Sequence, residues 1–204
     1  IGSYVNYRPS PEGVRDFLCY GFVPAPRTIF QGVLSVPPAM VCRLSKKNNA
    51  IQWQHFPQTI HAILNNPEQQ FWQALTEQSK TEHSALLLSG GLDSAMIAAS
   101  AKMAGANLQT YHAHFRGTAI DEDSDTHAAR LTAKHLNLAY KEIQIGSVEA
   151  LYWFEKVISS LDQPLGDPVV LPFYLLFREI AKAKQTQVLT GEGGDQLFGS
   201  WSMK

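Results

Sequence analysis

Short apolar runs and longer amphipathic stretches follow one another along most of the chain, which predicts strands that alternate with helices. The expected strands are 86–88, 108–115, 139–145 and 187–190, and the expected helices are 95–103, 128–136, 148–161 and 172–183. One or two further amphipathic helices are expected within 61–79. Strand–helix–strand repeats favour a parallel sheet with right-handed crossovers. The pattern therefore predicts an α/β fold in which a twisted parallel sheet is flanked by helices.

The first 45 residues differ from this pattern, because Pro and Gly recur throughout them. One helix fits between these turn formers, at 11–20, with Ser10 as the N-cap, Pro11 in the first turn and Gly21 after the last turn. Residues 48–57 are mostly polar apart from a few large apolar side chains, and we interpret them as a linker. By itself, this part of the sequence indicates only a connecting segment.

The most informative stretch is Ser-Gly-Gly-Leu-Asp-Ser at 89–94, between the run of leucines and a helix of small residues. Gly90 and Gly91 permit a tight turn close to a ligand, and the start of the helix attracts anions. Ser89 and Ser94 add hydroxyl donors, which favours a phosphate chain as the ligand. Asp93 suits such a site only if it holds a divalent cation such as Mg²⁺. The alternative is an ordinary strand–turn–helix junction capped by an Asp.

A second strand runs into a glycine turn at 191–199, Gly-Glu-Gly-Gly-Asp-Gln-Leu-Phe-Gly. Its carboxylates, Glu192 and Asp195, suit one metal ligand and one acid–base group or substrate contact. A helix start capped by acids is the alternative. The segment 162–168 is rich in Pro and Gly, and we interpret it as a candidate substrate loop.

Other polar residues are weaker candidates. His112 and His114 fall on one face of a predicted strand, as a zinc pair would, but no third ligand is evident nearby in the sequence. The acidic run 121–125 is better explained as helix capping than as a metal site. Cys19 and Cys42 are far apart and are expected to be reduced structural thiols.

Composition narrows the class of protein. The 204 residues are 45% hydrophobic and 17% charged, which suffices for one α/β domain and an extra segment. The net charge of −1 argues against a nucleic-acid partner. Because the sequence has neither a long apolar run nor a charged leader, we expect a soluble cytoplasmic protein without a membrane partner. The chain starts at Ile1 and ends just after a glycine motif, so we expect it to be part of a longer protein.

Three stretches resemble known families. The string 89–94 resembles the pyrophosphate loop of the ATP-pyrophosphatase (PP-loop) superfamily, and 190–199 resembles the second signature of asparagine synthetases. Residues 21–33, with the prolines at 37 and 38, resemble the end of the glutaminase domain in glutamine-dependent asparagine synthetases. The resemblance implies an adenine nucleotide alpha hydrolase-like fold. It also implies that 1–48 is the end of a glutaminase-type domain, and that 49–204 is the N-terminal part of an ATP-pyrophosphatase domain.

The resemblance also implies roles for individual residues, with ATP and Mg²⁺ as the bound species. Asp93 and Asp195 would hold Mg²⁺, and Glu192 would deprotonate or orient the nitrogen nucleophile. The residues that would contact ATP are Leu87, Ser89, Gly90, Gly91, Asp93, Ser94, Ala113 and Gly191.

The activity implied is an ATP-dependent carbon–nitrogen ligase that converts aspartate, ATP and glutamine or ammonia to asparagine, AMP and pyrophosphate. Its partners would be these small molecules, a glutaminase domain outside the chain and a second copy of the protein in a homodimer, and the chain alone would be inactive. Two departures concern the acceptor site: Gln196 replaces the usual Glu, and the loop at Asp167 lacks the family's threonines and arginine. The alternatives are a β-lactam synthetase-like or peptide-modifying relative with another acid substrate, and a nucleotide-binding module without catalysis.

Overall fold

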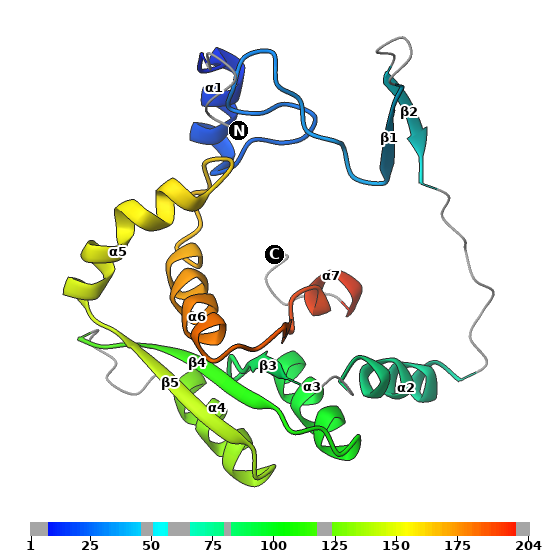
Figure 1. The fold of residues 1–204 in the computed structure, drawn as a ribbon, viewed down its shortest axis with the longest axis vertical. Helices are drawn as coiled ribbons and strands as arrows, with labels where there is room; N and C mark the ends of the chain where they lie inside the picture. The colour runs from blue at the N-terminus through cyan, green and yellow to red at the C-terminus, as the bar shows by residue number, and fades with distance from the viewer. Residues whose placement is uncertain (1–7, 46–50, 57–65, 80–82, 118–123, 199–204) are drawn as a thin grey trace. The chain divides into compact units, whose positions relative to one another are not determined.

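The computed structural model describes residues 8–45, 51–56, 66–79, 83–117 and 124–198. The chain divides into two compact units, one made of Ile1–Ile63 and Glu155–Val170 and the other of Leu64–Phe154 and Leu171–Lys204. The described helices and strands are drawn in Figure 1. None of the helices in these ranges combines the length and apolar character needed to cross a membrane.

The second unit contains the predicted parallel sheet. Its strands are β3 (Ser84–Leu87), β4 (Gln109–Phe115), β5 (Ala139–Ile145) and β6 (Gln187–Leu189), in the spatial order β5-β4-β3-β6. All three strand pairs are parallel, so the predicted α/β class is confirmed.

The order of the strands determines where a ligand can bind. From β3 the chain proceeds through β4 to β5 on one side, whereas β6 returns to the other side of β3. In open α/β sheets, ligands bind at the carboxyl ends of the strands where the order reverses in this way. Leu86 pairs with Leu189, so β3 and β6 end at nearly the same level. The two glycine turns that follow these strands therefore start side by side.

Helices cover both faces of the sheet (Figure 1). Helices α3 (Leu92–Met103) and α4 (Ser124–His135) cover one face, and α6 (Val170–Lys182) covers the other. Helix α2 (Pro67–Ser79) packs on α3, while α5 (Ser147–Ser160) follows β5 and α7 (Gly194–Phe198) follows β6 along the chain. Alternate residues of a strand point to opposite faces. Accordingly, Leu86 and Leu88 pack with alanines of α3 and α4, and Ala85 and Leu87 pack with leucine and isoleucine of α6. This burial on both faces explains the continuous apolar run in β3.

The first unit contains the predicted helix, α1 (Pro11–Tyr20). The Ser10 hydroxyl accepts a hydrogen bond from the Gly13 amide, at 3.2 Å, and Gly21 ends the helix with φ of 76°. The substrate-loop candidate belongs to this unit, where the Gly166 amide donates to the Gly21 carbonyl at 2.7 Å. The boundary at residue 48 stays a prediction.

The structure corrects the prediction of a linker at 48–57, because part of this segment is a strand. Within it, β2 (Ile51–His55) pairs antiparallel with β1 (Met40–Leu44), and Trp53 lies opposite Cys42. Ile51 and Trp53 do alternate with polar residues, as in a strand, but every residue of β2 is exposed. The alternation is therefore short and the apolar signal weak. Of the helices expected within 61–79, α2 is present, and residues 61–65 lie outside the described residues.

Candidate functional site

The first glycine turn joins β3 to α3 in only four residues. Gly90 has φ of 94°, in the left-handed region that favours glycine. Gly91 is the N-cap of α3; it has no side chain to cap the first turn of this helix, and its own amide donates to the Ser89 hydroxyl at 3.2 Å. The backbone N–H groups at the start of α3 are thus available to a bound anion. This geometry fits the predicted phosphate site.

The two serines of the turn bind each other. Their hydroxyl oxygens lie 3.0 Å apart, and the Ser89 amide donates to the Ser94 hydroxyl at 3.2 Å. Ser94 also donates to the Gly91 carbonyl at 3.1 Å and is only 2% exposed, whereas Ser89 is exposed. Ser94 therefore shapes the turn from inside, while Ser89 is accessible to a ligand.

The second glycine turn joins β6 to α7. Gly193 has φ of 99°, and the Gly194 amide donates to the Gly191 carbonyl at 3.3 Å. The Glu192 amide donates to the Thr190 hydroxyl, at 3.4 Å. These two hydrogen bonds fold the turn back on itself, so that α7 begins immediately after it.

The two turns pack directly against each other. A Cβ atom added to Gly191 would lie 3.0 Å from the Ser94 amide nitrogen and 3.0 Å from Cβ of Asp93. A Cβ added to Gly194 would overlap the carboxylate of Asp93, with its Cγ at 2.6 Å. Only glycine fits at these two contacts without a shift. Two sequence motifs about a hundred residues apart therefore form one site.

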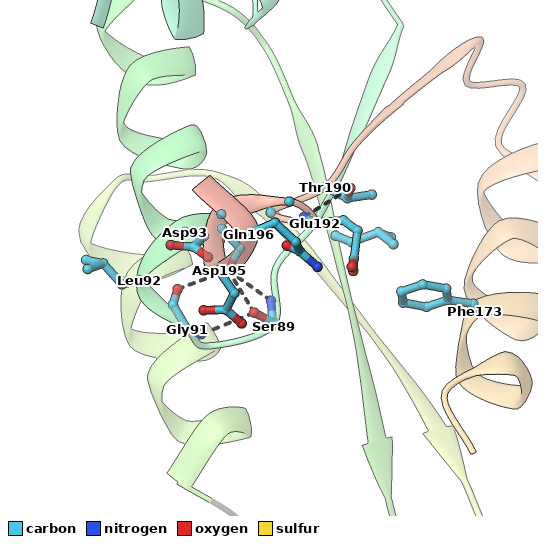
Figure 2. Close-up of a pocket in the computed structure, with 14 residues that line it drawn as sticks. Ser89, Gly91, Leu92, Asp93, Phe173, Thr190, Glu192, Asp195 and Gln196 are labelled. Atoms are coloured by element: carbon cyan, nitrogen blue, oxygen red, sulfur yellow. Dashed lines mark hydrogen bonds between the residues drawn. The ribbon is translucent and has the colours of Figure 1, made fainter. Parts of the chain in front are cut away.

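A cavity of about 610 Å³ lies where the turns meet. Figure 2 shows Ser89, Asp93 and Asp195 grouped near the start of α7, with Phe173 on α6 apart from them. Nine predicted site residues line this cavity: Leu87, Ser89, Gly91, Asp93, Ser94, Gly191, Glu192, Asp195 and Gln196. Five lining residues were not predicted: Leu92, Phe173, Thr190, Gly193 and Gly194. Four of these lie within the two motifs, 89–94 and 190–199, whereas Phe173 has no signal beyond its place in a predicted helix.

Three predicted residues lie elsewhere. Among the described residues that line the cavity, neither Gly90 nor Ala113 is found. Ala113 is half-buried on β4 and packs against the core cluster on the α6 side. Asp167 belongs to the first unit, where its carboxylate accepts a hydrogen bond from the Val169 amide at 2.9 Å. Its predicted place at the acceptor site therefore stays a prediction.

The cavity is acidic. Its described lining includes the carboxylates of Asp93, Glu192 and Asp195, and no Lys, Arg or His. Within the described residues, no group of three or more His, Cys, Asp or Glu side chains could enclose a metal ion. Mg²⁺ is commonly held by one or two carboxylates together with substrate phosphates. The all-oxygen donor set of Asp93 and Asp195 fits that kind of site.

The two histidines of β4 take part in hydrogen bonds. The Nε2 atom of His112 and the Nδ1 atom of His114 lie 2.9 Å and 3.2 Å from the hydroxyl of Thr126. All three side chains are buried. A shared hydroxyl, rather than a third metal ligand, thus joins the pair.

Comparison with known proteins identifies the family. The family model described as asparagine synthase matches residues 68–204, which include both glycine turns. A glutamine-hydrolysing asparagine synthetase from Bacillus subtilis is 24% identical over 200 residues, which is 94% of this chain and 31% of the relative. Another from Oryza sativa subsp. japonica is 29% identical over 189 residues, 82% of this chain and 31% of the relative. The chain thus spans about a third of the length of these relatives.

Among solved structures, a glutamine-dependent NAD⁺ synthetase from Acinetobacter baumannii in complex with ADP aligns with 78% of this chain and 31% of its own. The TM-score is 0.46 and the sequence identity 17%, a level of likeness that does not bear on function. The family match, in contrast, covers two thirds of the chain and both turns of the cavity. The chain belongs to the asparagine synthase family.

Proposed function

We propose that this protein forms an amide from a carboxylic acid and ammonia at the expense of ATP, through an acyl-adenylate. The proposed reaction converts aspartate, ATP and ammonia to asparagine, AMP and pyrophosphate, with glutamine as the source of ammonia. The names of the relatives, glutamine-hydrolysing asparagine synthetases, support this choice. The observation that carries the proposal is the acidic cavity that the two glycine turns form together at the ends of β3 and β6.

The phosphates of ATP would bind at the turn between β3 and α3. Uncapped N–H groups at the start of α3 and the exposed Ser89 hydroxyl are suitable donors. Ser94 would contribute by holding the turn in shape, through its bonds to Ser89 and Gly91. Leu87, Ala113 and Gly191 would lie beside the adenine and ribose.

A triphosphate does not bind an acidic cavity without added positive charge. Asp93 and Asp195 are the residues that would hold Mg²⁺, which when bound would neutralise the phosphates and the leaving pyrophosphate. Asp93 is held between Gly191 and Gly194 at the contact of the two turns. The metal would therefore require both motifs.

The proposed chemistry has two steps. A carboxylate oxygen of the acid attacks the α-phosphorus of ATP, and the bond from that phosphorus to pyrophosphate breaks. The nitrogen of ammonia then attacks the acyl carbon, and AMP leaves with the bridging oxygen. Glu192 would accept a proton from the nitrogen or orient it, because its carboxylate lines the same cavity as the phosphate turn.

The lining of the cavity bears on which acid is the acceptor. Gln196 lines the cavity where the family resemblance leads us to expect Glu, and the described lining has no cation to pair with a second carboxylate. These observations favour, as a second candidate, a β-lactam synthetase-like or peptide-modifying reaction with another acid. Asp167 would contact this acceptor.

The remaining parts of the proposal concern the whole protein. A glutaminase domain, to which 1–48 would belong, would supply ammonia, and the protein would act in the cytoplasm as a homodimer. Small molecules would be its substrates, without nucleic acid.

Exchange of labelled pyrophosphate into ATP tests the proposal in the full-length protein, with aspartate and other acids offered one at a time. We expect exchange that requires both Mg²⁺ and the acid. Exchange with another acid but not with aspartate would favour the second candidate. Tight ATP binding without exchange for any acid would favour a nucleotide-binding module without catalysis.

A further inference from the structure

A buried hydrogen-bonded chain of side chains lies behind the phosphate turn. The Nδ1 atom of His112 is 2.8 Å from the Leu88 carbonyl oxygen, and its Nε2 atom is 2.9 Å from the Thr126 hydroxyl. His112 is 6% exposed and Thr126 is 1% exposed. These hydrogen bonds therefore connect Thr126 on α4 to Leu88, the last residue of the apolar run before the turn.

The acceptor at Leu88 determines the direction of these hydrogen bonds. A carbonyl oxygen can only accept, so Nδ1 of His112 must donate to it. In the neutral ring Nε2 is then an acceptor, to which the Thr126 hydroxyl can donate. Thr126 thus holds His112 in the tautomer and orientation that the Leu88 carbonyl requires.

Two hydrogen bonds hold the Leu88–Ser89 peptide group, one on each side. The Leu88 amide still pairs with β4, by donating to the Tyr111 carbonyl at 2.9 Å, but its carbonyl is bound by a side chain. The N–H of the same Leu88–Ser89 peptide donates to the Ser94 hydroxyl, at 3.2 Å. Because a peptide group is planar, these two bonds together define its orientation. It is the peptide group at which the chain leaves the sheet and enters the turn.

A second contact joins α4 to the same turn. A Cβ atom added to Gly90 would overlap the carbonyl oxygen of Asp125 and would lie 2.8 Å from its carbonyl carbon. The first turn of α4 therefore rests on Gly90 itself. Asp125 adjoins Thr126, so the hydrogen-bonded chain and the packing contact act at one end of α4.

We infer that His112 and Thr126 are positioning residues for phosphate binding. They hold the Leu88–Ser89 peptide and α4 in the arrangement that aims the turn at a phosphate. The inference rests on the proposed function, since it assumes that the turn at 89–91 binds the phosphates of ATP. Neither side chain is among the described residues that line the cavity, so both act through the backbone.

The test compares two ligands, magnesium pyrophosphate and adenosine, titrated separately by calorimetry into the protein. Thr126→Val removes the hydroxyl and keeps the shape of the side chain. We expect it to weaken pyrophosphate binding about three- to tenfold, roughly the worth of one hydrogen bond, and to leave adenosine binding within about twofold. Thr126→Ser should restore the pyrophosphate affinity. Thr132→Val, the same change six residues further along α4, is the matched control and should alter neither.

A second pair of variants covers the case in which Thr126→Val does not fold. His112→Asn keeps a donor near the Leu88 carbonyl, whereas His112→Leu has none. We expect the Asn variant to bind pyrophosphate more tightly than the Leu variant.

The outcomes separate the inference from the proposed function. Equal pyrophosphate affinities for the two His112 variants would overturn the positioning role, as would parallel losses of pyrophosphate and adenosine binding in Thr126→Val. An unmutated protein that bound no magnesium pyrophosphate would overturn the phosphate site itself, and the inference with it.

Discussion

Replacing Gly194 with alanine should disable the metal site while leaving the fold intact. The new Cβ would overlap the Asp93 carboxylate, at 2.6 Å from its Cγ and 3.1 Å from Oδ1. These are the end atoms of a side chain, which can rotate away at a cost of about 0.5–1.5 kcal/mol if it leaves its preferred rotamer. Rotation removes the carboxylate from the position in which it would hold Mg²⁺.

The effect on stability should be small. Gly194 is the first residue of α7, and alanine is favoured over glycine by roughly 0.5–1 kcal/mol in the middle of a helix, which is an upper bound for this position. This gain offsets the cost of rotating Asp93. Since 1 kcal/mol corresponds to about 2–4 °C in a chain of this size, the midpoint of thermal unfolding should change by less than about 4 °C.

The effect on binding should be larger. A charge-assisted contact contributes about 1.5–3 kcal/mol, so loss of the Asp93 contact should weaken Mg²⁺-dependent ATP binding by roughly 10- to 150-fold. Calorimetric titration of ATP with and without Mg²⁺ measures the difference. Retention of the full Mg²⁺ dependence in Gly194→Ala would refute the assignment of Asp93.

Gly191→Ala is the informative comparison. Its Cβ would meet the backbone of α3, at 3.0 Å from the Ser94 amide nitrogen, and this contact cannot be relieved by rotating a side chain. Such overpacking typically costs about 1–3 kcal/mol. Gly191→Ala should therefore unfold at a lower temperature than Gly194→Ala. The reverse order would contradict the packing of the two turns.

Three further changes test individual residues. Asp93→Asn should abolish the Mg²⁺ dependence of ATP binding, and equal ATP affinity with and without Mg²⁺ in the unmutated chain would already exclude this metal site. Ser94→Ala should weaken ATP binding by about 1 kcal/mol, one hydrogen bond, because the Ser89 amide loses its acceptor; unchanged affinity in titrations would count against this role. Asp167→Arg in the full-length protein should raise the use of aspartate relative to the native acid in competition assays, through a contact of roughly 1.5–3 kcal/mol, and no change would remove Asp167 from the acceptor site.

The sheet and the phosphate turn could be predicted because their signals are local. The run 86–88 must be buried on both faces, and the adjacent glycines leave few alternatives to a tight turn before a helix. The hairpin of β1 and β2 was missed because its strands are held by pairing with each other rather than by a buried face. Pairing between segments leaves little trace in either segment alone.

Several features of the site depend on contacts between distant segments. Phe173 lines the cavity because α6 lies on the same face of the sheet as Leu87, which only the packing shows. The need for glycine at 194 arises from the carboxylate of Asp93, about a hundred residues away. The hydroxyl of Ser94 was expected to face a ligand, yet it lies inside the turn, because the Ser89 amide and the Gly91 carbonyl are within its reach.

The central claim is that the acid is activated by transfer of the adenylyl group of ATP to its carboxylate. The most direct test uses aspartate labelled with ¹⁸O in its side-chain carboxylate, in the full-length protein with ATP, Mg²⁺ and ammonia. Because the bridging oxygen leaves with AMP, mass spectrometry should find one ¹⁸O atom in AMP and none in pyrophosphate. Label in inorganic phosphate, with ADP as the other product, would show an acyl phosphate instead and would contradict the account.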